Sequence, residues 1–218
     1  MQRYFLQKLH NSTKRNYLQR MIDSKVKCMK ISKKYGKDYW DGKRKYGYGG
    51  YKYLPGRWAP FAKKLIKTYK LNKNSKILDV GCGKGFLLRE IKKLIPTAKI
   101  FGIDVSSYAL KYAKKIDGKF VKLSAQNKYP FKKNFFDLVI SINTLHNLEY
   151  FDLEKALREI ERVGKKKYIV AESYRNESEL FNLQCWALTC KSFFSPPEWK
   201  YIFKKIKFTG DKEFIFFK

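Results

Sequence analysis

The sequence predicts an α/β protein with a mostly parallel, doubly wound sheet. A glycine-rich turn and a regular alternation of strands and helices support this fold class, and the length of 218 residues suits one domain. The apolar run 77–80 enters the turn 81–85, and a helical pattern begins at Phe86. A buried strand that leads through such a turn into a helix forms the nucleotide-binding corner of these sheets.

Two details of this corner point away from a dinucleotide ligand. The glycines are spaced Gly81-x-Gly83-x-Gly85, and Asp79 precedes them where a carboxylate would repel a pyrophosphate but suit a cation. The stretch resembles the first motif of class I S-adenosylmethionine (SAM)-dependent methyltransferases, a strand ending in Asp-x-Gly-x-Gly-x-Gly. The resemblance implies SAM as the cofactor, with its methionine part against Asp79, Gly81, Cys82, Gly83 and Gly85. The alternative is a glycine turn in another kind of α/β protein.

The second predicted strand, residues 99–104, also ends in an acid. Asp104 lies 23 residues after Gly81, close to the spacing at which a carboxylate accepts both ribose hydroxyls. The resemblance implies the same role for Asp104, with Val105 beside it in the cofactor site. A plain helix cap at Asp104 is the alternative, and Ser106 and Ser107 are also available as caps.

The turn after the third predicted strand departs from the family pattern. A helix over 107–116 and a strand over 119–123 precede Ser124-Ala125-Gln126, where the family often has Gly-Asp-Ala with an acid on the adenine amino group. That acid is missing here. We expect Ser124, Gln126 or backbone groups around Ala125 to contact the adenine instead.

The fourth predicted strand, residues 135–142, leads into a polar loop. Asn143 and His146 emerge at the carboxyl edge of the sheet, where ligands of open α/β sheets bind. The ordinary pKa of histidine suits a general base near neutral pH, so His146 is a candidate catalytic residue. A loop histidine bonded to backbone is the alternative. Tyr48 is the second catalytic candidate, and Glu172 and Tyr174 are the other polar groups expected near this edge.

The remaining pattern completes a Rossmann-like methyltransferase fold. A helix over 152–163, a strand over 167–172, a helix over 181–190 and another from Ser195 precede a predicted hairpin over 208–217. The resemblance implies seven strands in a mostly parallel sheet, a C-terminal antiparallel hairpin and helices on both faces.

Residues 1–60 are predicted to form a helical and aromatic lid ahead of a SAM-binding domain over 61–218. Residues 1–35 are predicted to pack amphipathic helices on that domain, through the apolar side chains Phe5, Leu6, Leu9, Leu18, Met21, Ile22 and Val26. Residues 38–58 interleave aromatic residues with glycines and form a candidate substrate loop. Its rings suit a sulfonium or adenine, and Arg57 suits an anion. A surface loop that only packs on the core is the alternative.

The composition limits the partners. The net charge is +30, but lysine supplies most of the 49 basic residues and is scattered, as an A/T-rich genome would encode, so a nucleic-acid partner is left open but not favoured. The sequence has no C-x-x-C pair, no long apolar run and no signal-peptide pattern. We therefore expect no metal, no membrane span and a cytoplasmic location.

Three segments carry a closer resemblance. The aromatic stretch from Asp38 to Tyr51, the loop 143–148 and the stretch Phe-Phe-Ser-Pro-x-Glu-Trp over 193–199 resemble a bacterial methyltransferase group associated with capsule or lipopolysaccharide gene clusters. The resemblance implies a small anionic substrate: a sugar, a nucleotide-linked sugar or a phosphoramidate-type precursor. The expected substrate-binding residues are Tyr46, Tyr51, Arg57, Trp58, Glu172 and Tyr174.

Two other functions remain in view. An RNA methyltransferase would use the positive charge, although the loop after the fourth strand lacks the Pro-Pro-aromatic motif used on base amines, and no Pro-Cys nucleophile is present. A SAM-binding protein without catalytic activity would keep the same glycine corner. The sequence leaves the acceptor atom and the oligomeric state open.

Overall fold

The protein is built on one parallel sheet. The computed structural model describes residues 1–49 and 51–218, so Gly50 of the predicted lid lies outside the described residues. The strands are β1 (Lys76–Val80), β2 (Lys99–Asp104), β3 (Lys119–Lys122), β4 (Phe136–Ile142), β5 (Gly164–Glu172) and β6 (Asp211–Ile215). Their order is β3-β2-β1-β4-β5-β6, so the chain adds strands toward one edge of the sheet up to β3 and toward the other edge from β4, and the order reverses between β1 and β4. Ligands of such sheets bind at the carboxyl ends beside this point.

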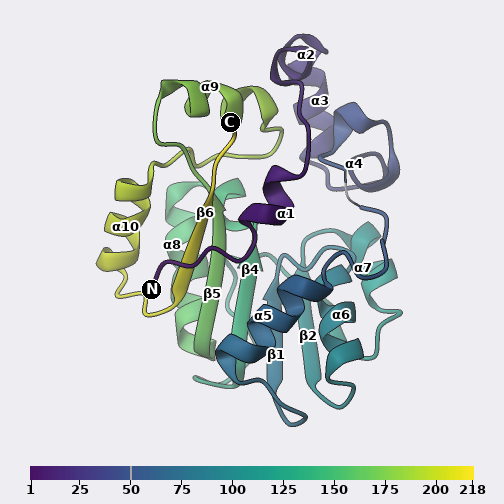
Figure 1. Ribbon diagram of the computed structural model, residues 1–218, viewed down its shortest axis with the longest axis vertical. Helices are drawn as coiled ribbons and strands as arrows, with labels where there is room; N and C mark the ends of the chain where they lie inside the picture. Colours follow the sequence, from purple (N-terminus) through teal and green to yellow (C-terminus); the bar gives the residue numbers. More distant parts are fainter. Residues whose placement is uncertain (50) are drawn as a thin grey trace.

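Helices cover both faces of the sheet (Figure 1). They are α1 (Gln7–Asn11), α2 (Tyr17–Ile22), α3 (Lys25–Ser32), α4 (Lys37–Asp41), α5 (Ala59–Tyr69), α6 (Phe86–Leu94), α7 (Ser107–Ala113), α8 (Tyr150–Val163), α9 (Glu177–Trp186) and α10 (Pro196–Lys205), with short 3-10 turns η1 (Arg44–Tyr46) and η2 (Leu145–Asn147). Along β1 the side chains alternate: Ile77 joins the core under α5, α6 and α7, whereas Leu78 joins the core under α8 and α10.

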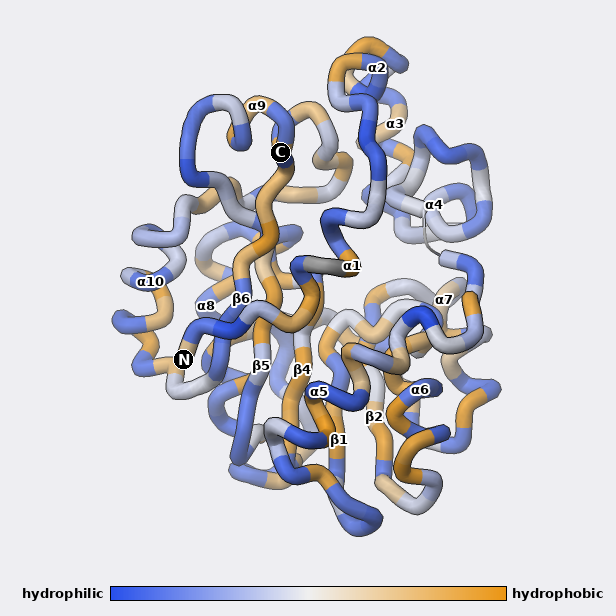
Figure 2. Tube along the Cα trace, in the orientation of Figure 1, coloured by the Kyte–Doolittle hydropathy of each residue, from blue (hydrophilic) through white to orange (hydrophobic). Residues whose placement is uncertain are grey.

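Hydrophobic residues are concentrated along the central strands β1, β2, β4 and β5 (Figure 2). Their apolar side chains are almost wholly buried, because helices cover both faces of a parallel sheet. The five strands predicted between residues 77 and 172, and the helices between them, are confirmed. The helix predicted over 181–190 instead spans Glu177–Trp186, because Asn176 caps it and accepts the backbone N–H of Glu179 at 3.0 Å.

The predicted seventh strand and C-terminal antiparallel hairpin are wrong. In the described residues the sheet has six strands, and β6 runs parallel to β5, with Tyr168 paired to Asp211 and Glu172 to Ile215. The outer edge of β6 meets the first residues of the chain, where Gln2 pairs with Lys212 and the backbone N–H of Arg3 donates to the Lys212 carbonyl at 2.8 Å. Hydrogen-bonding groups on that edge are thus used by the N-terminal segment.

The N-terminal segment is fixed to the sheet by a buried acid. The carboxylate of Glu213 on β6 accepts the backbone N–H groups of Phe5, Leu6 and Gln7 at 2.6, 2.8 and 3.1 Å. It also accepts the hydroxyl of Tyr168. These bonds satisfy the free N–H groups at the start of α1, and they hold α1 beside β6 (Figure 1).

Beyond α1 the N-terminal helices pack differently from the prediction. Leu6 is buried as expected, but Leu18, Met21, Ile22 and Val26 are exposed. The buried side chains of α2 and α3 are polar or small: Arg20, Cys28 and Ser32. These two helices are held by hydrogen bonds through polar groups, which the spacing of apolar residues does not reveal.

Candidate functional site

A cavity of about 920 Å³ opens at the carboxyl ends of the strands, under the N-terminal segment and the aromatic stretch. Its size lies within the usual range for small-molecule sites. Most of the predicted site residues line it: Tyr48, Tyr51, Arg57, Trp58, Asp79, Gly81, Cys82, Gly83, Asp104, Val105, Ser124, Ala125, Gln126, Asn143, His146 and Glu172.

Three predicted site residues do not line this cavity. Gly85 is the residue before α6, and a side chain there would meet Ile116 in the core. Tyr46 belongs to η1, and its carbonyl accepts the Ser32 hydroxyl at 2.7 Å. Tyr174 packs with the apolar cluster that contains Leu183. Tyr46 and Tyr174, which were expected to contact a substrate, therefore do not line this cavity.

The glycine turn after β1 is shaped by close approaches. Gly81, Gly83 and Gly85 all have positive φ, at 81°, 52° and 75°. A Cβ on Gly81 would lie 2.0 Å from the hydroxyl oxygen of Thr144, and one on Gly83 would lie 2.7 Å from the ring of Trp40. The turn is thus built for glycine by its backbone angles and by its neighbours.

Two buried acids stand beside this turn. Asp104 accepts the backbone N–H of Gly83 at 2.8 Å through one oxygen and that of Ser106 at 2.7 Å through the other. Burial and the nearby Asp104 raise the pKa of Asp79 to about 7. Burial also raises the pKa of Asp104. Two acids at the ends of neighbouring strands make this end of the cavity suited to a cation.

The cap of α7 is supplied by Ser106 rather than by Asp104. The Ser106 hydroxyl accepts the backbone N–H of Ala109 at 3.0 Å, and it donates to the carbonyl of Tyr35 at 2.6 Å. Each Asp104 oxygen has further lone pairs beyond its one backbone bond, as binding to ribose hydroxyls requires. The alternative of a plain cap at Asp104 is therefore wrong.

Sequence reasoning missed Trp40 as a member of this site. Its indole N–H lies 2.8 Å from the Ser106 hydroxyl and 3.1 Å from the Tyr35 carbonyl, and its ring lies against Gly83. Lys84 of the glycine turn forms an ion pair with Asp41 at 2.6 Å. These contacts dock α4 directly on the glycine turn. The only signal in the sequence was the aromatic character of the whole stretch.

Tyr48 connects the aromatic stretch to the loop after α9. Its hydroxyl accepts the backbone N–H groups of Leu188 and Thr189 at 2.7 and 3.0 Å, and it lies 3.0 Å from the Thr189 hydroxyl. Arg20 supports the same junction and donates to the carbonyls of Trp186 and Gly47 at 3.3 and 2.8 Å. These bonds fix the Tyr48 side chain, which connects the aromatic stretch to the wall of the cavity.

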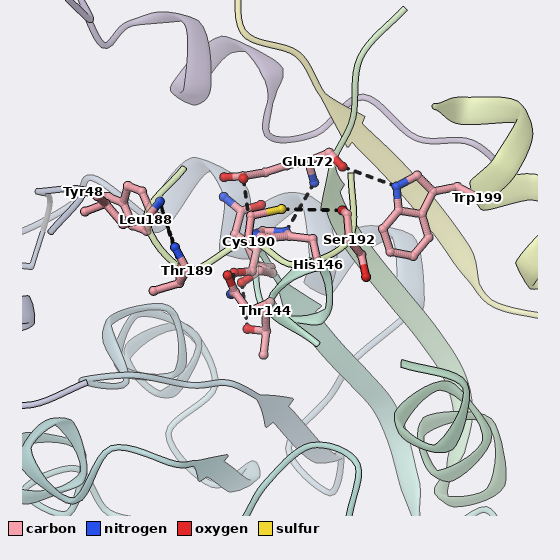
Figure 3. A network of polar contacts seen from close by, with 12 residues as sticks. Tyr48, Thr144, His146, Glu172, Leu188, Thr189, Cys190, Ser192 and Trp199 are labelled. Carbon is pink, nitrogen blue, oxygen red and sulfur yellow. Dashed lines mark hydrogen bonds and ion pairs between the residues drawn. The ribbon is translucent and has the colours of Figure 1, made fainter. Parts of the chain in front are cut away.

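His146 and Glu172 meet at the ends of β4 and β5 (Figure 3). His146 Nε2 lies 3.3 Å from Glu172 Oε2, and the backbone N–H of Glu172 points to His146 Nδ1 at 3.5 Å. Both side chains are buried. Burial lowers the pKa of His146 to about 3 and raises that of Glu172 to about 8, so burial disfavours both charged forms. His146 is thus the neutral partner of a carboxyl group.

Four buried side-chain atoms lack a hydrogen-bond partner among the described residues, and all four belong to residues that line the cavity. They are Arg15 Nε, Asn143 Oδ1, Asn147 Oδ1 and Glu172 Oε2. Buried polar atoms are rarely left unpaired without a reason. Their concentration in one cavity indicates a place for a polar ligand.

The cavity is lined by charged residues of both signs. Asp79 and Asp104 lie at the glycine turn, and four cationic residues from the first part of the chain also line the cavity: Arg15, Lys33, Arg44 and Arg57. These four form no ion pair with an acid in the described part of the chain. The two buried acids and the glycine turn fit the positively charged methionine part and the ribose of SAM.

Within residues 1–49 and 51–218, no group of three or more His, Cys, Asp or Glu side chains is arranged to hold a metal ion. Over the same residues, no helix combines the length and the apolar character that crossing a bilayer requires.

Comparison with known proteins identifies the family of the domain. Residues 71–207 match the family model described as "Methyltransferase domain". A mouse protein named "Arginine-hydroxylase NDUFAF5, mitochondrial" is 34% identical over 109 residues, which cover 50% of this chain and 31% of that protein. A malonyl-[acyl-carrier protein] O-methyltransferase of Legionella pneumophila is 39% identical over 92 residues, which cover 40% of this chain and 32% of that protein. The chain thus spans about a third of the length of these curated relatives.

Solved structures agree on the fold. A geranyl diphosphate C-methyltransferase from Streptomyces coelicolor, solved with S-adenosyl-L-homocysteine, superposes with a TM-score of 0.55 at 14% identity. The superposition covers 66% of this chain and 58% of that one. Residues 71–207, which match the family model, contain β1 to β5, the glycine turn, Asp104 and the His146–Glu172 pair. The chain therefore belongs to the SAM-dependent methyltransferase domain family.

Proposed function

We propose that the protein transfers a methyl group from SAM to a small metabolite that carries an anionic group. The observation that carries this proposal is the charged lining of the cavity, which combines buried acids at the glycine turn with cationic residues from the N-terminal part of the chain. The acids suit the cofactor, and the arginines suit a carboxylate or phosphate on the acceptor.

The chain's own residues have distinct tasks in this proposal. Asp104 accepts the ribose hydroxyls, and Asp79 faces the positively charged methionine part. Backbone groups around Ala125, with Ser124 and Gln126 beside it, contact the adenine. When bound, SAM supplies a methyl group attached to a positively charged sulfur. The cavity residues align an acceptor with that carbon and exclude water.

The N-terminal part of the chain encloses the acceptor in this proposal. Residues 1–60 act as a lid on the domain formed by 61–218, because Trp40 rests on Gly83 and Tyr48 is bonded to the loop after α9. Closure by aromatic residues favours a small acceptor. A sugar, nucleotide-linked sugar or phosphoramidate-type precursor of a cytoplasmic polysaccharide pathway has the required size and charge.

Methyl-labelled SAM and a cell extract test this proposal. We expect label in a small-molecule product that an anion exchanger retains. A variant with Arg15→Gln and Arg57→Gln should raise KM for that acceptor at least tenfold, because each removed charge-assisted contact contributes about 1.5–3 kcal/mol. Arg158→Gln removes an exposed arginine of α8 and is the matched control. Label in RNA alone would replace this proposal with an RNA methyltransferase.

A further inference from the structure

We infer that Glu172 accepts the proton of an O–H or N–H nucleophile on the methyl acceptor, and that His146 positions Glu172 for this step. The inference rests on the proposed methyltransferase function and names the acceptor chemistry of the same cavity. It also changes the expected role of His146 from a base to a positioning residue.

The contacts of the His146 ring decide which of the two side chains can take a proton. Nδ1 faces the backbone N–H of Glu172 at 3.5 Å, so this nitrogen is the acceptor of the ring. The ring proton therefore sits on Nε2, which lies 3.3 Å from Glu172 Oε2 but forms no hydrogen bond with it in the described residues. Because Nε2 carries the ring proton and the lone pair of Nδ1 faces a backbone N–H, His146 has no lone pair for a substrate. The carboxyl group of Glu172 has unused lone pairs.

The unpaired polar atoms of the cavity indicate which chemical groups a ligand must carry. Glu172 Oε2, Asn143 Oδ1 and Asn147 Oδ1 are hydrogen-bond acceptors without a donor in the described residues. A ligand that satisfies them must bring O–H or N–H groups. Arg15 Nε is the unpaired donor and suits an acceptor oxygen on the same ligand. A metabolite with hydroxyl or amine groups next to an anionic group meets both requirements.

The surroundings of Glu172 keep it able to exchange a proton near neutral pH. Burial raises its pKa to about 8, and the positive charge of Arg15, in the segment between α1 and α2, opposes this rise. The other titratable groups that face it are His146 from η2, Tyr48 from the aromatic stretch and Cys190 from the loop after α9. Burial raises the pKa of the Tyr48 phenol and of the Cys190 thiol, so both stay neutral while Glu172 titrates.

The step balances without another reactant. A lone pair of the acceptor oxygen or nitrogen forms a bond to the methyl carbon, and the bond between that carbon and sulfur breaks. Its electrons stay on sulfur, which becomes neutral. The proton leaves the acceptor for Glu172 Oε2 and passes to water after the product leaves. Ionised Glu172 is the form that can accept the proton, so the rate should increase as pH rises toward 8.

Histidine NMR tests the pair without any turnover. The chain contains two histidines, His10 and His146. In ¹⁵N-histidine-labelled protein, His146 should stay neutral with its proton on Nε2 from pH 6 to 9. Its resonances should shift once near pH 8 as Glu172 ionises. His10→Gln assigns the signals, and Glu172→Gln should abolish the shift. A His146 that titrates near pH 6.5, or shows no step near pH 8, overturns the inference.

Kinetics with the labelled acceptor fraction test the catalytic role. Glu172→Gln should reduce kcat about 100-fold or more and remove its rise with pH, while SAM affinity stays within twofold. His146→Gln keeps an N–H near Glu172 and should retain more activity than His146→Leu. A Glu172→Gln variant with wild-type kcat would overturn the inference. Wild-type protein that transfers label to no fraction contradicts the proposed function, whereas the NMR titration still decides whether the pair exists.

Discussion

Asp79 connects cofactor binding to pH at the level of one residue. Burial raises its pKa to about 7, so it is protonated at pH 6 and ionised at pH 8. A cationic ligand favours the ionised form. We therefore expect SAM affinity to rise between pH 6 and 7.5, by up to about tenfold per pH unit. Calorimetric titration at several pH values measures this change.

Asp79→Asn is the control for this pH dependence. It cannot ionise, so its SAM affinity should be weaker and nearly independent of pH over the same range. The same linkage affects the ligand-free protein. Because the folded-state pKa of Asp79 is raised, stability that is present below about pH 4 should be lost as pH rises through 7. An affinity that falls as pH rises from 6 would contradict this account of Asp79.

Asp104 is expected to contribute more to SAM affinity than its neighbours. Asp104→Ala removes two backbone bonds and the proposed ribose contacts, so affinity should fall at least tenfold, since one hydrogen bond to a charged group contributes about 1.5–3 kcal/mol. Ser106→Ala is the matched control: it removes the α7 cap and the Trp40 contact but keeps the carboxylate. Unchanged SAM binding by Asp104→Ala would exclude the proposed cofactor pose.

At the scale of single residues, the sequence predicted those site residues that lie in a local motif. Asp79, the glycines and Asp104 were recognisable because a strand, a turn and an acid follow one another at fixed spacing. The Glu172 partner of His146 and the Trp40 ring on Gly83 join residues far apart in the chain. Such contacts depend on how α4 and β5 are placed, and no local spacing records them.

At the scale of elements, Glu213 fixes the N-terminal segment to β6. Glu213→Ala leaves three backbone N–H groups without their carboxylate, so the free energy of unfolding should fall by about 3 kcal/mol. Residues 1–11 should then be cut faster by protease. Urea denaturation and limited proteolysis measure these changes. Glu177→Gln, an exposed acid of α9, is the control, and equal stability of both variants would refute the role of Glu213.

Strands were predictable as elements, but the pairing at the sheet edge was not. Residues 208–217 contain enough apolar residues for two strands, yet the structure uses Asp211–Ile215 as one strand parallel to β5. Pairing depends on which segment reaches the free edge, and Gln2 reaches it from the other end of the sequence. Likewise, the apolar residues of α2 predicted a buried face, whereas Arg20 is the buried residue of that helix.

At the scale of the whole molecule, binding of polyanions by the net charge of +30 must be distinguished from substrate binding in the cavity. A lysine-rich surface binds polyanions through released counterions, and such binding weakens steeply as salt increases. We expect binding to an unrelated RNA to fall by about a hundredfold or more between 50 and 200 mM salt. Methyl transfer to the small-molecule fraction should change far less. Equal losses would indicate that the surface lysines bind the substrate.

The most direct test of the central claim is the size of the methyl acceptor. An extract is treated with nuclease and protease, passed through a filter that retains macromolecules, and incubated with the wild-type protein and methyl-labelled SAM. The account predicts that the filtrate accepts label as well as the untreated extract does. Label transfer that disappears after nuclease treatment, or stays with the retained macromolecules, would contradict it.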